Sequence, residues 1–316
     1  MDILVTGALK LTNEEMKILE SIAGNVTFLQ DERFETDIDV SIYEAVICNS
    51  LFVNNDIDKF SSLKYIQLTS AGTDRVPMEK VVRKGISLQT ARGVYSIPMA
   101  EWAMCKALDH VKQTSFFEEN QKNKKWEKSR TLTELNEKNV CIVGFGSIGA
   151  ECGKRFSAFG CKVTAVDVFP VESPYVSKYL NVSQLEEALK DADVVILTLP
   201  LTSETKGLFN KEALSILKEG SLLINMARGG LIDEEAFIDV LKEGKIYAAL
   251  DVFETEPLSE SSPLWTFSNV SVSPHNSFVS DGNDKRLKNL IFENLKTYME
   301  RRTDYKGTCI HGTHGE

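Results

Sequence analysis

Apolar residues along the first hundred positions fall into short runs that alternate with segments of helical periodicity. One helical pattern covers residues 13–22. The short runs lie at 3–7, 26–30, 45–49, 65–70 and 86–90. Such alternation is typical of a parallel sheet flanked by helices. The pattern therefore predicts a first α/β layer in this part of the chain.

Residues 94–119 carry a longer helical pattern, and its only breaker is Pro98 in the first turn. An uninterrupted pattern of this length predicts one rigid helix that connects two domains. The polar segment 120–130 follows it and interrupts the apolar rhythm. A second α/β unit is expected to start at Asn139.

The second unit contains five β-rich runs separated by helical stretches, and a sixth run follows them. The runs lie at 139–146, 162–168, 193–200, 221–227, 246–252 and 269–274. Six parallel strands with crossover helices match a doubly wound sheet. A further amphipathic helix is predicted at 284–301, and the polar, glycine-rich residues after it are expected to be poorly ordered.

A chain of 316 residues exceeds the usual size of one hydrophobic core. We therefore predict an α/β protein of two domains. We expect one domain over 1–98 and 279–316 and a doubly wound Rossmann domain over 99–278.

Charge and apolar run length narrow the classes of partner. The formal net charge of −10, with no Lys/Arg-rich segment, would repel nucleic acid and anionic lipid. No apolar run approaches the roughly 20 residues that cross a bilayer. The chain begins Met1-Asp2 and enters a strand-like run with no basic region before it, which indicates a cytoplasmic protein.

The six cysteines show no CxxC pair, and two of them, Cys48 and Cys141, fall inside strand-like apolar runs. A thiol in such a run packs as a small apolar group. We expect the cysteines to be reduced and structural, and we expect no metal site.

Three glycines follow the strand predicted at 140–143. Gly144, Gly146 and Gly149 form a GxGxxG pattern that opens a helix. Gly144 would make the tight turn, Gly146 would let the backbone approach a pyrophosphate, and Gly149 would let helix pack on strand. The alternative is a helix-packing turn without a ligand, but the placement between strand and helix favours a dinucleotide site.

An acidic residue ends the next predicted strand. Asp167 lies 18 residues beyond Gly149, where a carboxylate accepts hydrogen bonds from the adenosine ribose. The same carboxylate would repel a ribose 2′-phosphate, and the residues that follow, VFPVE, offer no Lys or Arg to neutralise one. NAD is therefore expected rather than NADP.

Four histidines are available as a proton-transfer group. His311 and His314 lie in the polar tail and His110 in the connecting helix, so each has a simpler structural explanation. His275 directly follows the last predicted strand, at the edge of an open sheet where ligands bind.

Arg228 and Glu256 follow other strands at this same edge. An arginine fits a carboxylate, a histidine exchanges a proton near neutral pH, and a glutamate orients the imidazole. Together these three side chains predict a site for 2-hydroxy acid chemistry.

The sequence resembles the D-isomer-specific 2-hydroxyacid dehydrogenases. The resemblance rests on VGFGSIG with Asp167, LTLPLTSET, INMARGGLIDEEA, AALDVFETEPL and SPH, and on TSAGTDRV, which is similar to the substrate loop of the family. It implies a Rossmann domain, a smaller flavodoxin-like domain built from both chain ends, oxidoreduction of a small 2-hydroxy or 2-keto acid with D specificity, and a homodimer.

The resemblance also implies roles for individual residues. Arg228 would bind the substrate, His275 would be the acid/base, and Glu256 would pair with it, whereas Glu254 is a competing carboxylate. Backbone N–H groups of Ser70, Ala71 and Gly72 would hold the substrate carboxylate. The cofactor-binding residues would be Gly144, Phe145, Gly146, Ser147, Ile148, Gly149, Asp167, Pro200, Thr205, Ala227, Arg228, Asp251 and His275, with Asp251 bonded to the nicotinamide carboxamide.

Two departures from the family pattern bear on the substrate. Phosphoglycerate dehydrogenases of the family tend to carry a basic residue after the third N-terminal strand, where this chain has Leu51 and Phe52. A phosphorylated substrate is therefore less favoured, although Arg75 or Arg92 could supply charge. Phe278, after the SPH motif, could narrow the pocket.

Two other functions stay open. One is an NAD-sensing scaffold without catalysis, similar to the co-repressors that resemble this family. The other, an L-specific lactate or malate dehydrogenase, is less favoured because its glycine motif normally lies near the amino terminus and not beyond residue 139.

Overall fold

The structure is a computed structural model that describes residues 1–304, with side chains described to residue 301. The chain divides into two compact units. Unit 1 comprises Met1–Val94 and the segment that begins at Asp281, and unit 2 is Tyr95–Ser280. The predicted domain boundaries at 98/99 and 278/279 fall near these division points and remain predictions. The predicted disorder of the tail, with Cys309, His311 and His314, lies outside the described residues.

Unit 1 is built on five parallel strands in the order β2-β1-β3-β4-β5. The strands are β1 (Asp2–Thr6), β2 (Asn25–Leu29), β3 (Ala45–Cys48), β4 (Tyr65–Leu68) and β5 (Ser87–Gln89). The interior strands β3 and β4 are buried at every position, whereas β2 at the edge is largely exposed. The predicted α/β layer is confirmed.

The helices of unit 1 include one that comes from the far end of the chain. They are α1 (Asn13–Ala23), α2 (Leu51–Asn54), α3 (Met78–Arg83) and α10 (Asn283–Asp304), with the 3-10 helix η1 (Ile57–Lys59). Thr12 and Glu15 form a capping box at the start of α1. Glu15 also accepts from Lys288 of α10, with Nζ and Oε2 2.9 Å apart. This buried amine therefore helps to fix the C-terminal helix on the N-terminal sheet.

Unit 2 is built on seven parallel strands in the order β12-β11-β10-β9-β6-β7-β8. The strands are β6 (Asn139–Val143), β7 (Lys162–Asp167), β8 (Lys178–Asn181), β9 (Val194–Leu197), β10 (Leu222–Asn225), β11 (Tyr247–Leu250) and β12 (Val270–Val272). The prediction of six strands was wrong by one. β8 is a four-residue edge strand in which Leu180 alone is buried, so it has no apolar run in the sequence.

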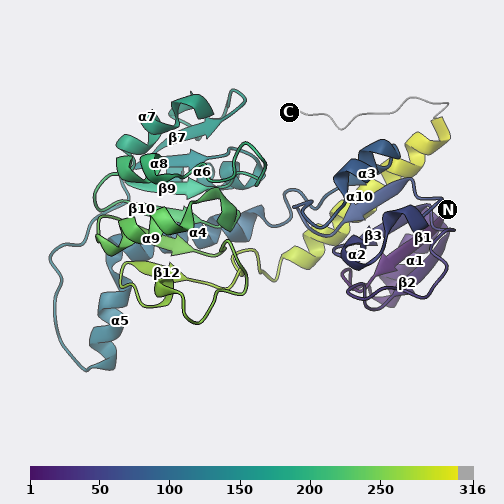
Figure 1. Cartoon of the computed structure of the whole chain (residues 1–316), viewed down its shortest axis with the longest axis horizontal. Coiled ribbons are helices and arrows are strands. Elements are labelled where there is room, and N and C mark those ends of the chain that lie inside the picture. Colours follow the sequence, from purple (N-terminus) through teal and green to yellow (C-terminus); the bar gives the residue numbers. More distant parts are fainter. Residues whose placement is uncertain (305–316) are drawn as a thin grey trace. The chain divides into compact units, whose positions relative to one another are not determined.

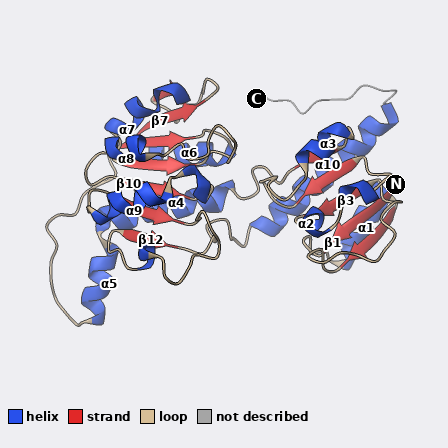
Figure 2. Cartoon of the chain, viewed as in Figure 1, coloured by secondary structure: helices blue, strands red, loops and turns tan. Residues whose placement is uncertain are grey.

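Helices cover both faces of this sheet (Figure 2). They are α4 (Ser96–Lys112), α5 (Thr114–Lys122), α6 (Ser147–Ala158), α7 (Leu185–Lys190), α8 (Lys211–Ile216) and α9 (Glu234–Lys242), with the 3-10 helices η2 (Val182–Gln184), η3 (Gly229–Leu231) and η4 (Pro263–Trp265). Val140 and Ile142 of β6 pack in the cluster that contains α4 and α6, whereas Cys141 and Val143 pack in the cluster that contains α7, α8 and α9. Burial on both faces explains the continuous apolar runs.

The predicted single helix over 94–119 is in fact two helices. Gln113 has a left-handed backbone, with φ 50°, and separates α4 from α5. Its side chain donates to Thr131 Oγ1 at 2.9 Å and accepts from Ser129 Oγ at 2.8 Å. These bonds from a distant segment hold a break that no glycine marks in the sequence. Figure 1 shows α5 and the loop after it projecting away from the sheet of unit 2.

Candidate active site

In the glycine turn between β6 and α6, Gly144 and Gly149 are closely packed against neighbouring backbone, whereas Gly146 faces open space. Gly144 has φ +91°, and a Cβ there would lie 2.8 Å from the backbone nitrogen of Leu199. A Cβ on Gly149 would lie 2.3 Å from the carbonyl oxygen of Gly144. A Cβ on Gly146 would meet nothing within 4 Å. Gly146, followed by Ser147 and Ile148 in the first turn of α6, therefore presents open backbone at a helix N-terminus, which suits a pyrophosphate.

Asp167, at the end of β7, is bonded to the glycine turn. Its Oδ2 accepts from the backbone N–H of Phe145 at 2.6 Å, and its Oδ1 accepts from that of Val168 at 2.7 Å. The hydroxyl of Tyr179 donates to the Asp167 carbonyl at 3.2 Å. The carboxylate is therefore held at the carboxyl ends of β6 and β7, where the ribose of a dinucleotide would lie.

A loop of hydroxyl side chains follows β9, the other neighbour of β6. Thr205 Oγ1 donates to the carbonyl of Pro200 at 2.7 Å and accepts from the backbone N–H of Thr202 at 2.8 Å. Thr198 Oγ1 donates to the carbonyl oxygens of Val143 and Gly144. Thr198 thus fixes the glycine turn to the end of β9, a role that the sequence reasoning missed.

His275 and Glu256 form a hydrogen-bonded pair at the carboxyl edge of the sheet. His275 Nδ1 lies 2.8 Å from Glu256 Oε2, and the side chains are 40% and 37% exposed. Glu256 Oε1 also accepts from the backbone N–H of Phe253 at 3.1 Å, which orients the carboxylate. The competing Glu254 is exposed. Of the two candidate carboxylates, the structure pairs Glu256 with the imidazole.

Asp251, at the end of β11, is fully buried and holds the loop that carries His275. Its carboxylate accepts from Ser273 Oγ at 2.5 Å and from the backbone N–H groups of Asn276 and Ser277 at 2.8 and 2.9 Å. Its carbonyl accepts from the N–H of His275 at 2.8 Å. The loop N–H groups are therefore satisfied inside the protein. The predicted bond from Asp251 to the nicotinamide carboxamide stays a prediction.

Arg228 extends from the loop after β10. Asn225, buried at the end of that strand, accepts from the N–H of Ala227 at 3.1 Å and donates to the carbonyl of Arg228 at 3.0 Å. Arg228 Nη1 donates to the carbonyl of Ala227 at 2.7 Å. A Cβ on Gly229 would lie 1.9 Å from the carbonyl carbon of Phe253, so the loops after β10 and β11 are in close contact. Asn225 was not among the predicted site residues, although an amide at the end of an apolar run could have indicated it.

The remaining predicted residues belong to unit 1. Ser70, Ala71 and Gly72 follow β4, and Ser70 Oγ donates to the carbonyl of Gly72 at 2.9 Å. The structure thus brings His275 into contact with Glu256 and closes the loop that contains Ser70 on itself. The assigned binding roles remain predictions.

Four of the described thiols are buried, and His110 is half-buried. Of the five cysteines described, none is in a disulfide and four are buried. Burial raises the pKa of the Cys141 and Cys152 thiols to about 12, so both stay protonated. Burial also lowers the pKa of His110, whose ring lies 4.5 Å from that of Tyr247.

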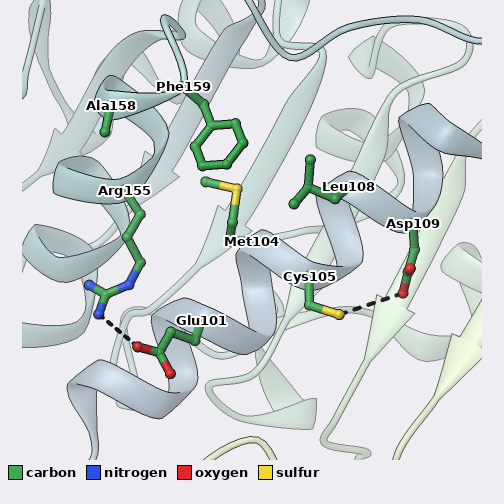
Figure 3. Close-up of a pocket in the computed structure, with 8 residues that line it drawn as sticks. All are labelled: Glu101, Met104, Cys105, Leu108, Asp109, Arg155, Ala158 and Phe159. Atoms are coloured by element: carbon green, nitrogen blue, oxygen red, sulfur yellow. Dashed lines mark hydrogen bonds and ion pairs between the residues drawn. The ribbon is translucent and has the colours of Figure 1, made fainter.

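A hollow of about 560 Å³ lies on unit 2 between α4 and α6 (Figure 3). Its lining comprises Glu101, Met104, Cys105, Leu108, Asp109, Arg155, Ala158 and Phe159. Its wall is mostly apolar, and the ion pair between Arg155 and Glu101 crosses one side. The predicted site residues do not line it, so the hollow is separate from the candidate active site.

Residues 1–304 contain neither a metal-binding cluster nor a candidate membrane-spanning helix. No group of three or more His, Cys, Asp or Glu side chains there is arranged to hold a metal ion. No helix in this part of the chain combines the length and apolar character needed to span a bilayer.

Residues 104–277 match the family model described as the D-isomer specific 2-hydroxyacid dehydrogenase NAD-binding domain. The chain belongs to this family. The match covers both the glycine turn and the His275–Glu256 pair. It also makes unit 2 a nicotinamide dinucleotide-binding unit, as predicted from the glycine turn.

Curated relatives and solved structures agree with this assignment. The chain is 33% identical to the D-3-phosphoglycerate dehydrogenase of Methanocaldococcus jannaschii over 94% of its own length and 57% of that protein. It is 35% identical to the hydroxypyruvate reductase of Thermotoga maritima over 69% of this chain and 72% of that protein. The TT0316 protein of Thermus thermophilus has the same fold, with a TM-score of 0.77 and 29% identity over 95% and 97% of the two chains.

Substitutions in the glycine turn should separate folding from cofactor binding. Gly146→Ala places a methyl group in open space, so the free energy of unfolding should change by no more than about 1 kcal/mol. The methyl group would occupy the place of the pyrophosphate, and the Kd for NADH should rise at least about tenfold. Fluorescence titration of NADH measures the affinity, and urea unfolding measures the stability.

Gly149→Ala is the matched control, because its methyl group would collide with the Gly144 carbonyl. It should lower the free energy of unfolding markedly. Unchanged NADH affinity in a folded Gly146→Ala protein would contradict the assignment of this turn to the pyrophosphate.

Proposed function

We propose that the protein is an NAD-dependent oxidoreductase that transfers a hydride between NAD(H) and a small D-2-hydroxy acid or its 2-keto acid. The observation that carries this proposal is the 2.8 Å pair of His275 and Glu256 at the carboxyl edge of the NAD-binding sheet. Arg228 follows a neighbouring strand at the same edge. This edge is where open α/β sheets bind ligands.

The imidazole of His275 exchanges the proton of the reaction. Nδ1 faces Glu256, which leaves Nε2 as the nitrogen for the substrate hydroxyl. In oxidation the neutral ring would accept the hydroxyl proton, and in reduction the protonated ring would donate it. NAD(H), when bound, would supply the hydride acceptor or donor. The Glu256 carboxylate holds the ring in this orientation through its contact with Nδ1.

Arg228 and the loop after β4 bind the substrate. The guanidinium of Arg228 offers a fork of donors that matches a carboxylate or a carbonyl with its neighbouring oxygen. The backbone N–H groups of Ser70, Ala71 and Gly72 would hold the substrate carboxylate. Phe278, whose ring centroid lies 6.0 Å from that of His275, would limit the size of the substrate side chain.

The cofactor preference rests on Asp167. Its carboxylate is bonded to the N–H groups of Phe145 and Val168, so it cannot turn away from the ribose without losing these bonds. A 2′-phosphate would meet a fixed negative charge there. We therefore propose NAD over NADP.

The relatives carry names with different substrates, and they include a glyoxylate reductase from Thermofilum pendens that is 34% identical. Their range supports a small 2-keto acid but does not select one. Because the chain spans 57% of the M. jannaschii phosphoglycerate dehydrogenase, a shared substrate does not follow. Leu51 and Phe52, both buried after β3, favour an acid without phosphate.

We also propose a homodimer that uses the α4 face of unit 2. The family resemblance supports it, and so does the mostly apolar hollow between α4 and α6. Trp126, which is 95% exposed in the loop after α5, is a second apolar group in this unit that a partner would cover. Light scattering would give the mass in solution.

A cytoplasmic location is proposed from the absence of disulfides among the described cysteines.

A panel of 2-keto acids with NADH tests the function. Glyoxylate, pyruvate, hydroxypyruvate, and branched and aromatic 2-keto acids are mixed with the protein, and loss of NADH absorbance is followed. At least one acid should be reduced, and His275→Ala should lower kcat by roughly a hundredfold or more. Tight NADH binding without turnover of any acid would instead favour the non-catalytic NAD-sensing scaffold.

Glu256→Gln should lower kcat in both directions at least about tenfold. The amide keeps the shape of the side chain but removes the charged acceptor that meets Nδ1 of His275, so the ring is held less firmly for proton transfer. Initial rates measure the effect. Glu254→Gln, on an exposed neighbour, is the control and should leave kcat unchanged. An unchanged kcat in Glu256→Gln would overturn the pairing.

Asp167→Ser should lower the preference for NADH over NADPH at least about tenfold, because the fixed charge near the 2′ position is removed. The ratio of kcat/KM for the two cofactors measures this preference. Glu172→Gln removes an exposed charge from the same loop and should leave the ratio unchanged. Equal ratios in Asp167→Ser and the unsubstituted protein would contradict the role of Asp167.

A further inference from the structure

Glu32 is a nearly buried acid in the loop after β2, and it is 6% exposed. Its Oε2 accepts from Thr6 Oγ1 at 2.6 Å and from the backbone N–H of Asn49 at 3.0 Å. Its Oε1 accepts from the backbone N–H and the hydroxyl of Ser50 at 2.6 and 2.9 Å. A carboxylate with this many donors is firmly fixed, because each charged hydrogen bond is stronger than a neutral one.

Glu32 lies at the carboxyl edge of the sheet of unit 1, between the ends of β1 and β3. In the order β2-β1-β3-β4-β5, the chain continues from β1 to β2 on one side and returns to β3 on the other. The gap at the carboxyl ends of β1 and β3 is therefore the switch point of the sheet, where folds of this strand order hold ligands. Thr6 ends β1, and Asn49 and Ser50 directly follow β3. Glu32 bridges this gap.

Glu32 accepts hydrogen bonds from backbone N–H groups that could otherwise bind an anionic ligand. Consecutive backbone N–H groups after a parallel strand commonly bind anions. Here the N–H groups of Asn49 and Ser50 both point to Glu32. The chain thus supplies its own anion at the position where a phosphate or second carboxylate of a ligand could lie.

The segment after β3 carries no Lys or Arg that could offset the charge of Glu32. Residues 49–53 read NSLFV, and Leu51 and Phe52 are buried. Burial raises the pKa of the adjacent Cys48 thiol, and the negative charge of Glu32 adds to this rise. The carboxyl end of β3 therefore holds a fixed carboxylate, and residues 49–53 carry no Lys or Arg to offset its charge.

This region adjoins the loop proposed to bind the substrate carboxylate. β3 and β4 are neighbours, and the N–H of Thr69 donates to the carbonyl of Cys48 at 2.9 Å. Ser70, Ala71 and Gly72 follow directly. A second anionic group on the substrate, close to its carboxylate, would approach the loop that Glu32 supports.

We propose that Glu32 is a positioning residue that sets substrate specificity: its carboxylate takes the anion position at the switch point of unit 1 and restricts the enzyme to 2-keto acids whose substituent carries no negative charge. This inference rests on the proposed function. Glu32 acts through the Asn49–Ser50 segment and through its charge, and it does not touch the reacting atoms.

The test compares hydroxypyruvate with its 3-phosphate, two 2-keto acids that differ by one phosphoryl group. The ratio of kcat/KM for the phosphate to kcat/KM for hydroxypyruvate should be below one in the unsubstituted protein. In Glu32→Gln, which removes the charge and keeps the shape, this ratio should rise roughly tenfold or more, as expected when one charge near an anion is removed. Glu32→Asp keeps the charge and should keep the low ratio.

Glu35→Gln is the matched control, because Glu35 is an exposed acid of the same segment and is paired with Lys59. It changes the net charge equally and should leave the ratio unchanged. An equal fall of both rates in Glu32→Gln, with the same ratio, would show a purely structural role and overturn the proposal. A preference of the unsubstituted protein for the phosphate would overturn it even if Glu32→Gln does not fold.

A failure of the proposed function would be seen separately, as no turnover of any 2-keto acid by the unsubstituted protein. In that case calorimetric titration of the NADH complex with hydroxypyruvate 3-phosphate decides the proposal. Glu32→Gln should bind this compound at least about tenfold more tightly than the unsubstituted protein does. Equal binding, including no binding by either protein, would overturn the assignment of Glu32.

Discussion

The buried carboxylate of Asp251 is the constraint on which the geometry of the candidate active site depends. It accepts three hydrogen bonds from the segment 273–277, and His275 lies within this segment with a left-handed backbone, φ 50°. That conformation costs about 1–2 kcal/mol for a residue with a Cβ. Hydrogen bonds to a charged group contribute about 1.5–3 kcal/mol each, so the loop is held in spite of the cost. The ring of His275 is thereby presented to Glu256.

Three acids hold loops at the carboxyl edges of the two sheets. Asp251 binds the loop after β12, Asp167 binds the glycine turn after β6, and Glu32 binds the segment after β3. In each case a carboxylate oxygen accepts hydrogen bonds from backbone N–H groups in a loop that follows a strand. These N–H groups lie beyond the strand and have no partner in the sheet. A buried N–H without a partner is costly, so each acid stabilises the loop that it meets. The loops at these edges are thus fixed by polar contacts, whereas the strands are fixed by apolar packing.

The two kinds of contact explain which parts of the structure could be predicted from sequence. The interior strands of both sheets leave a direct signal because burial on both faces demands continuous apolar runs. The edge strand β8, with Leu180 as its one buried residue, leaves no such signal. The break at Gln113 was missed for a related reason, since Ser129 and Thr131 hold it from a distance and no glycine marks it.

The candidate site shows the same division. The glycine turn and the His275–Glu256 pair could be inferred because short motifs, and a family resemblance, specify them. Asn225 and Thr198 act through hydrogen bonds to loops that are brought near by the fold, and single polar residues give no pattern to detect. Glu32 is the extreme case, because its partners Thr6, Asn49 and Ser50 come from two other segments of the chain. Only the strand order places them together.

An acid that holds a loop by hydrogen bonds also fixes a negative charge at the carboxyl edge of the sheet. In the proposed function, the charge of Asp167 faces the ribose and favours NAD, whereas the charge of Glu32 lies at the switch point of unit 1 and disfavours a second anion on the substrate. The charge cannot be removed without also removing acceptors of backbone N–H groups. Loop stability and ligand preference are therefore coupled in these residues, which is why an amide or a shorter acid is needed to separate the two effects. A change of specificity at either position would require a new acceptor for the same N–H groups as well as a new charge.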